Sequence, residues 1–216
     1  MRDTFNDTFD RLAETTSEIL GVFLSRKLSG TYDAALQGIK LMKRKCGVVV
    51  LDSTLGAMGQ GLLVIEATKK AFAGVSLDKL VQTVAETIPW IHVRASLGSL
   101  KYLAMGGRIG KAQALLASVL KINPILGIKD GEAFPIAKLR SKVKANEWLH
   151  RFATGFADVK ALAVEYGTNF DAAKVLAKRI ASLLPNVPIY LSQINPVIGT
   201  HTGPETIIVS VLSGER

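Results

Sequence analysis

The chain has 216 residues, of which 48% are hydrophobic and 21% charged, and its formal net charge is +9 at pH 7. This composition predicts a folded protein of one large or two small domains and argues against a disordered chain. The apolar runs are short and interrupted, so no membrane insertion is expected. The acidic N-terminal residues lack the character of a signal peptide, and we expect a cytoplasmic protein.

The basic residues are dispersed along the chain, and no DNA- or RNA-binding motif accompanies them. At helical spacing they are expected to form solvated faces, with a minority available to an acidic partner or an anionic ligand. Cys46 is the single cysteine, which excludes an internal disulfide and a cysteine-based zinc site. We therefore expect no nucleic-acid partner and no metal.

Short apolar runs that are typical of strands alternate with longer stretches of helical period, which predicts an α/β fold. In the first part of the chain this alternation favours parallel strands. Its expected elements are a helix over 5–12, a strand over 19–24, a helix over 31–45, a strand over 48–51, and helices over 60–72 and 76–88.

Beyond Trp90 the pattern predicts a mostly antiparallel sheet flanked by helices. Asp130-Gly131 stands between two extended runs, which is a strong hairpin signal. We therefore divide the chain into two domains, residues 1–88 and 89–216. The expected elements of the second domain are a strand over 90–93, the hairpin about 130–131, a helix over 142–156, a strand over 159–164, a helix over 171–184, and strands over 189–191 and 207–212.

The stretch SRKLSGTYDAA, residues 25–35, places hydroxyls and a glycine where the first strand becomes a helix. The start of a helix has free backbone N–H groups and a partial positive charge, so it attracts an oxygen ligand or an anion. Ser29 could cap the helix, Gly30 could let the backbone approach a ligand, and Thr31 could donate to an anion. An ordinary helix cap explains the same residues.

Three further polar sites stand out. Asp52 and Ser53 follow the second expected strand, where open α/β sheets place ligands, although a helix cap explains Asp52 as well. Arg108, in MGGRIG, is expected in a turn where its guanidinium could face an anion or solvent. His201, in VIGTHTGPET, is expected in a tight turn, where the two flanking threonines would hold its ring for anion binding or proton transfer; a structural role is equally compatible.

An apolar stripe follows Arg108. Ala112, Leu115, Leu116, Val119 and Leu120 recur at a spacing that places them on one face of a helix. Core packing is enough to explain this stripe.

Taken together, four segments resemble the DegV family of bacterial fatty-acid-binding proteins. They are SRKLSGTYDAA, VLDSTLGAMGQGLLVIEA, LKYLAMGGRIGKAQALLASVLKINPIL and VIGTHTGP, in the family's order and approximate spacing from about residue 18 to the end. The resemblance implies a two-domain α/β protein that holds one long-chain fatty acid between its domains, without a cofactor. It further implies a carrier, not an enzyme, that presents the carboxylate to a fatty acid kinase, which makes an acyl phosphate for phospholipid synthesis.

The resemblance also assigns residues. Ser29 matches the family serine that hydrogen-bonds the carboxylate, with Gly30 and Thr31 beside it, and His201 matches the histidine of the HTG turn. The remaining assignments are Arg108 and Arg140 as basic positions near the head group or the kinase-facing surface, and Leu115, Leu116, Val119 and Leu120 as the side of the stripe that faces the acyl chain.

One departure from the family pattern concerns the N-terminal region. Family members begin with a strand that carries an Asp-Ser signature and continue to a TS-P motif, whose threonine also contacts the carboxylate. This sequence begins after both motifs, so we expect a truncated N-terminal domain or one that another segment or a partner completes.

The alternative is a phosphotransfer enzyme or phosphocarrier that uses His201, because the family shares its fold with dihydroxyacetone kinase subunits. A Walker-type phosphate loop, metal-ligand spacing and a G-x-S-x-G motif are all missing from the sequence, which favours the carrier.

Overall fold

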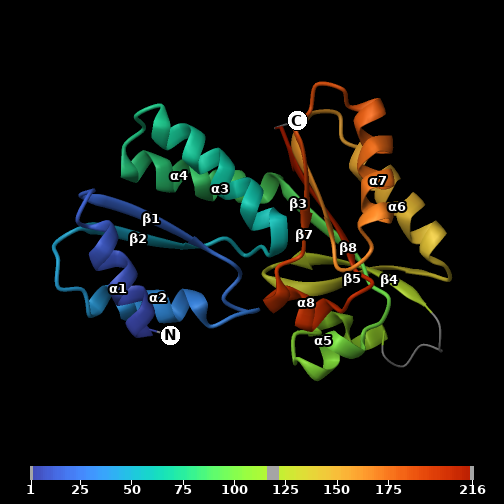
Figure 1. Ribbon diagram of the computed structural model, residues 1–216, viewed down its shortest axis with the longest axis horizontal. Coiled ribbons are helices and arrows are strands. Elements are labelled where there is room, and N and C mark those ends of the chain that lie inside the picture. Colours follow the sequence, from blue (N-terminus) through green and yellow to red (C-terminus); the bar gives the residue numbers. More distant parts are fainter. Residues whose placement is uncertain (1, 116–121, 215–216) are drawn as a thin grey trace.

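The computed structural model describes residues 2–115 and 122–214. These residues form two β-sheets, with helices on the outside and helix α3 between the sheets (Figure 1). The helices are α1 (Arg2–Leu12), α2 (Thr31–Lys40), α3 (Ala57–Phe72), α4 (Leu77–Thr87), α5 (Lys101–Met105), α6 (Lys142–Thr154), α7 (Phe170–Leu183) and α8 (Pro196–Thr202), with short 3-10 helices η1 (Ile88–Trp90) and η2 (Gly110–Leu115). The strands are β1 (Glu18–Phe23), β2 (Gly47–Asp52), β3 (Ile91–Ser96), β4 (Asn123–Lys129), β5 (Glu132–Leu139), β6 (Val159–Tyr166), β7 (Ile189–Gln193) and β8 (Ile207–Ser213).

The smaller sheet pairs β1 with β2 in parallel. Helices α1 and α2 lie on one side of it, and α3 and α4 lie on the other (Figure 1). Apolar side chains of both strands, including Leu20, Val22 and Leu51, pack into the cluster around α3. The small sheet therefore shares a hydrophobic core with the rest of the molecule.

The larger sheet has the strand order β5-β4-β3-β8-β6-β7, and its pairs are antiparallel except for β6 with β7. One face packs on α3, and α6 and α7 cover the other face. The expected hairpin is confirmed: Asp130 and Gly131 have φ angles of 53° and 80°, the left-handed conformations that a two-residue hairpin turn requires.

Helix α3 lies unusually close to the larger sheet because Gly59 has no side chain. A Cβ atom on Gly59 would lie 2.4 Å from Cγ2 of Val93 on β3. The neighbouring Leu62 and Leu63 are fully buried. The glycine thus lets the helix backbone contact β3 while the leucines fill the space on either side.

A buried carboxyl group connects the larger sheet to the start of α3. Glu165 of β6 is only 4% exposed, and its Oε2 accepts a 2.8 Å hydrogen bond from the backbone N–H of Met58 in the first turn of α3. Burial raises the pKa of Glu165 to about 7, although the hydrogen bond from Met58 opposes the increase. Glu165 therefore changes its charge near neutral pH, at the contact between the sheet and the helix.

The predicted α/β class is confirmed, with parallel strands in the first part and a mostly antiparallel sheet in the second. The domain boundary near residue 89 stays a prediction.

The expected helix over 31–45 was too long: α2 ends at Lys40, because Asp10 of α1 accepts the backbone N–H groups of Lys43 and Arg44 at 3.0 and 2.8 Å and holds them in a turn. Within residues 2–115 and 122–214, no helix combines the length and apolar character needed to cross a bilayer.

The substitution Glu165→Gln tests the role of this buried carboxyl group. Between pH 4.5 and 7 the folded wild type binds a proton that the unfolded chain releases, so its free energy of unfolding falls as the pH rises through this window. The total loss is on the order of 3 kcal/mol at pH 8. Glutamine keeps an acceptor for Met58 but does not ionise. We therefore expect the fall in unfolding free energy with pH to be absent in the variant when both proteins are denatured with urea between pH 5 and 8. If the unfolding free energies of wild type and variant depended equally on pH, this role of Glu165 would be contradicted. Glu86→Gln, at an exposed site, is the control.

Candidate functional site

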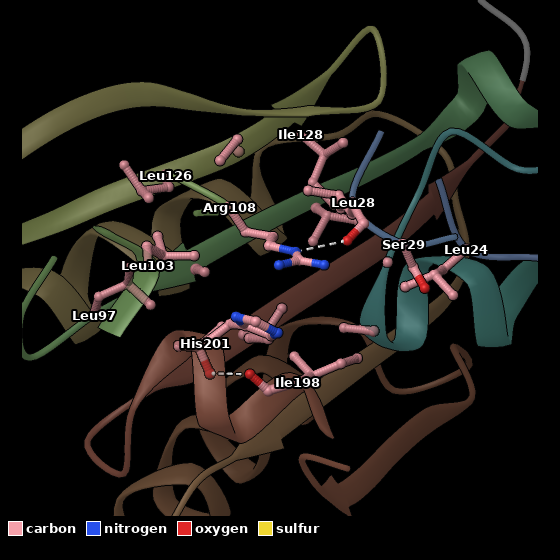
Figure 2. Close-up of a pocket in the computed structure, with 18 of the residues that line it drawn as sticks. Leu24, Leu28, Ser29, Leu97, Leu103, Arg108, Leu126, Ile128, Ile198 and His201 are labelled. Atoms are coloured by element: carbon pink, nitrogen blue, oxygen red, sulfur yellow. Dashed lines mark hydrogen bonds between the residues drawn. The ribbon is translucent and has the colours of Figure 1, made fainter. Parts of the chain in front are cut away.

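One cavity of about 270 Å³ opens between the first and second parts of the chain (Figure 2). Its walls come from the loop before α2, the start of α3, strands β3, β4 and β8, and helices α5 and α8. Most of its lining side chains are apolar, and its polar lining groups are Ser29, Thr31, Arg108, His201 and Thr202.

Ser29 and Thr31 lie where β1 leads into α2. The hydroxyl oxygen of Ser29 accepts the backbone N–H of Thr31 at 3.3 Å and is 3.1 Å from the hydroxyl oxygen of Thr31. If the Thr31 hydroxyl donates to Ser29, the Ser29 proton is free to donate to a ligand. The expectation that Ser29 caps α2 was wrong: Gly30 is the N-cap residue, because the chain turns into the helix one residue later.

No neighbouring part of the protein requires a glycine at position 30. Its φ is −77°, and a Cβ atom there would meet nothing within 4 Å. It also does not line the cavity, although Ser29 and Thr31 on either side of it do. Gly30 therefore leaves open space at the positive end of a ten-residue helix.

Arg108 reaches across the cavity from the segment between α5 and η2. Its Nε donates to the carbonyl oxygen of Leu28 at 3.1 Å, and one terminal nitrogen donates to the carbonyl oxygen of Gly106 at 2.7 Å. The side chain is exposed, and Figure 2 shows its guanidinium between Leu28 and His201. Arg108 thus connects the two parts of the chain at the cavity and keeps positive charge there.

His201 lies in the last turn of helix α8, not in the tight turn that was expected. Asn195 accepts the backbone N–H of Val197 and Pro196 begins the helix, which explains why the segment is helical. The expectation that the neighbouring threonines hold the ring was also wrong. Thr200 and Thr202 donate their hydroxyls to backbone carbonyls of α8 instead.

Gly106 positions the His201 ring. A Cβ atom on Gly106 would lie only 2.1 Å from Nδ1 of His201. Nδ1 is buried, and it has no hydrogen-bond partner among the residues that the structure describes. An unpartnered N–H costs more than an unpartnered lone pair, which favours the tautomer that carries its proton on Nε2. This tautomer offers an N–H donor on the side of the ring away from Gly106.

The other end of the cavity is apolar. In Figure 2, Leu97, Leu103 and Leu126 lie at one end and Ser29 lies at the opposite end, with Arg108 and His201 between them. The three leucines belong to a buried cluster next to α5. The polar side chains Ser29, Arg108 and His201 therefore lie at one end and in the middle of the cavity, and the opposite end is apolar, as an amphiphilic ligand requires.

The predicted acyl-chain residues do not form the described part of this apolar end. Leu115 is buried in the leucine cluster next to the cavity but is not one of the lining residues. Leu116, Val119 and Leu120 lie outside the described residues. Arg140 is exposed after β5 and does not line the cavity.

Sequence reasoning missed most of the cavity wall. No role at the site was predicted for the wall residues Val93 and Ala95 of β3, Leu126 and Ile128 of β4, and Ile198 of α8. Strand alternation was the available signal, since residues two apart on a strand face the same side.

Asp52 and Ser53 serve the loop and not a ligand. Asp52 accepts the backbone N–H groups of Thr54 at 2.8 Å and Arg26 at 3.3 Å, and buried Ser53 accepts that of Leu55 at 3.1 Å. Across the described ranges, no group of three His, Cys, Asp or Glu side chains is placed to hold a metal ion. The site can thus bind an acidic amphiphile through hydrogen bonds and apolar contact.

The family model and the curated relatives that match this chain all belong to one family. The family model described as "Uncharacterised protein, DegV family" matches residues 1–214. A DegV domain-containing protein of Streptomyces coelicolor is 34% identical over 98% of this chain and 76% of its own length, and one of Caldanaerobacter subterraneus is 32% identical over 93% and 72%.

Solved structures show the same fold. A DegV family protein from Thermus thermophilus, described by its fatty acid binding, has a TM-score of 0.87 at 27% identity and covers 99% of this chain and 77% of that one. A stearic-acid-binding protein from Eubacterium ventriosum has a TM-score of 0.90 at 23% identity and covers 98% and 76%. By sequence and by fold, the chain belongs to the DegV family.

Proposed function

We propose that this protein binds a long-chain fatty acid in the cavity, with the carboxylate at the Ser29 end and the acyl chain against the leucine cluster. The observation that carries the proposal is a cavity with polar side chains at the Ser29 end and in its middle and apolar side chains at the other end. The fatty acid binding described for the Thermus thermophilus relative supports it.

The acyl chain supplies most of the affinity. Burial of a methylene group contributes about 0.8 kcal/mol, so a chain of ~14 methylenes gains on the order of 11 kcal/mol before the costs of ordering. The lining side chains Leu97, Leu103 and Leu126 offer the apolar contact that this gain needs.

The polar end offsets the cost of desolvating the carboxylate. An ion that leaves water without partners loses far more free energy than one hydrogen bond returns, so several donors must meet it. Ser29 can donate its hydroxyl proton, His201 its Nε2 proton, and Arg108 contributes charge from the opposite wall. These three groups come from three separate segments, so the carboxylate would be bound only in the folded protein.

We further propose that the bound carboxylate is presented to a fatty acid kinase. The carboxylate oxygen attacks the γ-phosphorus of ATP on the kinase. The bond between the γ-phosphorus and the oxygen that bridges it to the β-phosphate breaks, so ADP is released and the fatty acid becomes an acyl phosphate. Arg108 is exposed and so is Gly30 next to Ser29, which supports a polar head-group site close to the surface, where a kinase could reach it. Arg140 is proposed as a contact of the kinase and not of the fatty acid.

The substitution Ser29→Ala tests the carboxylate site. We expect roughly tenfold weaker binding of a sixteen-carbon fatty acid, because one hydrogen bond to a charged group is lost. Binding of the matching alcohol should change little, and so should the thermal unfolding midpoint. Ser182→Ala, on the exposed side of α7, is the control. Unchanged affinity for the acid would refute the assignment of Ser29.

Gly106→Ala tests the orientation of His201. The added methyl must displace the imidazole, and we expect the unfolding free energy to drop by about 1–3 kcal/mol and the His201 ring resonances to shift. Affinity for the acid should fall more than affinity for the alcohol. Gly199→Ala on α8 is the matched control, since a Cβ there meets nothing within 4 Å. Equal losses for acid and alcohol would mean that the His201 ring does not serve the head group.

Native mass spectrometry and a reconstituted reaction test the carrier role. We expect a co-purifying species of fatty-acid mass, and with kinase and ATP an acyl phosphate that hydroxylamine traps. Arg140→Gln should slow phosphorylation without weakening fatty acid binding. A stable adduct of phosphate mass on His201, with no bound lipid, would favour the phosphocarrier instead.

A further inference from the structure

A second cavity lies at the N-terminal end of strand β3. It has a volume of about 380 Å³ and is formed by the start of β3, the hairpin of β4 and β5, and the loop between β2 and α3. In contrast to the first cavity, it is lined by several charged or titratable side chains: His92, Arg94, Lys129 and Asp130.

This cavity exists because the larger sheet splits there. Strands β3 and β4 pair only from Arg94 to Ser96, opposite Ile125 to Gly127. The first three residues of β3 have no partner on β4, although they pair with β8 on their other side. The hairpin therefore diverges from β3 and leaves a gap between them.

The Arg94 guanidinium is held at this gap from two sides. It lies 5.0 Å from the centre of the Phe152 ring, and its NH1 donates to the carbonyl oxygen of Val93 at 2.8 Å. A Cβ atom on Gly127 would lie 2.8 Å from NH1, so the guanidinium rests on β4 where the strand has no side chain. The group is thus fixed before any ligand arrives.

The positive charge of Arg94 is not balanced within the described part of the chain. No carboxylate lies within 4.0 Å of it, and its Nε and NH2 donate no hydrogen bond to these residues. Burial lowers the pKa of Arg94 below its ordinary value, with no opposing effect from a nearby anion. A guanidinium in such a position favours an anion from solution.

The other groups around the cavity leave an excess of positive charge. Lys129 is exposed and forms no ion pair within the described residues; its Nζ lies 5.7 Å from the centre of the Phe134 ring. Asp130 is exposed at the hairpin turn and likewise forms no ion pair there. The His92 ring stacks on Phe156 at 4.9 Å and closes one side. Two cations therefore face the cavity against one carboxylate at its edge.

We propose that the second cavity binds a phosphate group, with Arg94 as the principal ligand and Lys129 as the second cation. The planar guanidinium can donate two parallel hydrogen bonds to phosphate oxygens. Two cations on two strands match a dianion better than they match a single carboxylate. The site is separate from the acyl cavity, so the proposal does not depend on fatty acid binding.

Calorimetric titration of inorganic phosphate at pH 8 and constant ionic strength in chloride tests this site. We expect saturable binding that is roughly tenfold weaker in Arg94→Gln and several-fold weaker in Lys129→Gln. Arg151→Gln on the exposed side of α6 removes the same charge outside the cavity and should leave phosphate binding unchanged. Lys129 is exposed, so Lys129→Gln is expected to fold normally. It therefore still tests the site if Arg94→Gln fails to fold.

Two comparisons define the ligand. Acetate should bind much more weakly than phosphate, and equal binding would overturn the phosphate assignment. Tight binding of glycerol 3-phosphate supports a phosphate carried on a larger polar molecule, whereas binding of inorganic phosphate alone supports the free anion. Backbone amide resonances of residues 92–94 and 127–130 should shift on binding. No saturable binding, shifts at residues 29–31 instead, or full affinity in both cavity variants would refute the site.

Discussion

The contact of α3 with both sheets is the constraint on which the rest of the structure depends. The small sheet cannot bury its apolar side chains alone, since a two-stranded sheet is not stable in isolation. Helix α3 joins it to the larger sheet, and Gly59 allows the close approach to Val93. Glu165 adds a polar contact at the start of the same helix through Met58. Helix α3 is therefore the main packing contact between the two parts of the molecule, and the hydrogen bonds of Arg108 with Leu28 and of Ser25 with Gly131 add to it.

This placement forms the cavity and requires strained backbone conformations beside it. Gly56 and Ala57, where α3 begins, line the cavity wall. Thr54 and Ala57 both have φ angles of 54°, a left-handed conformation that costs roughly 1–2 kcal/mol for a residue with a Cβ. Asp52 accepts a hydrogen bond from the backbone N–H of Thr54 and Glu165 accepts one from that of Met58, and these bonds hold the loop in this shape. Backbone strain is thus concentrated next to the site, and the hydrogen bonds accepted by half-buried Asp52 and buried Glu165 offset it.

Sequence patterns predicted the parts of the fold that depend on local interactions. Short apolar runs marked the strands, and Asp130-Gly131 marked the hairpin, because both signals arise within a few residues. The short helix that carries His201 also had a local signal in Asn195 and Pro196, which was missed. The cavity wall could not be predicted in this way, because separate strands, helices and loops each contribute one or two side chains to it. Gly106 likewise gains its role only when α5 and α8 meet.

Strand β3 shows how two different sites can share one element. Successive side chains of a strand point to opposite faces, so Val93 and Ala95 line the apolar cavity while His92 and Arg94 supply the titratable side chains of the second one, which Ile91 also borders at the start of the strand. A register shift of one residue would place Arg94 among the leucines and destroy both sites. The unbroken antiparallel pairing of β3 with β8 prevents such a shift, and the incomplete pairing with β4 opens the gap. Complete pairing on one edge of β3 and partial pairing on the other therefore place the second cavity at the start of the strand.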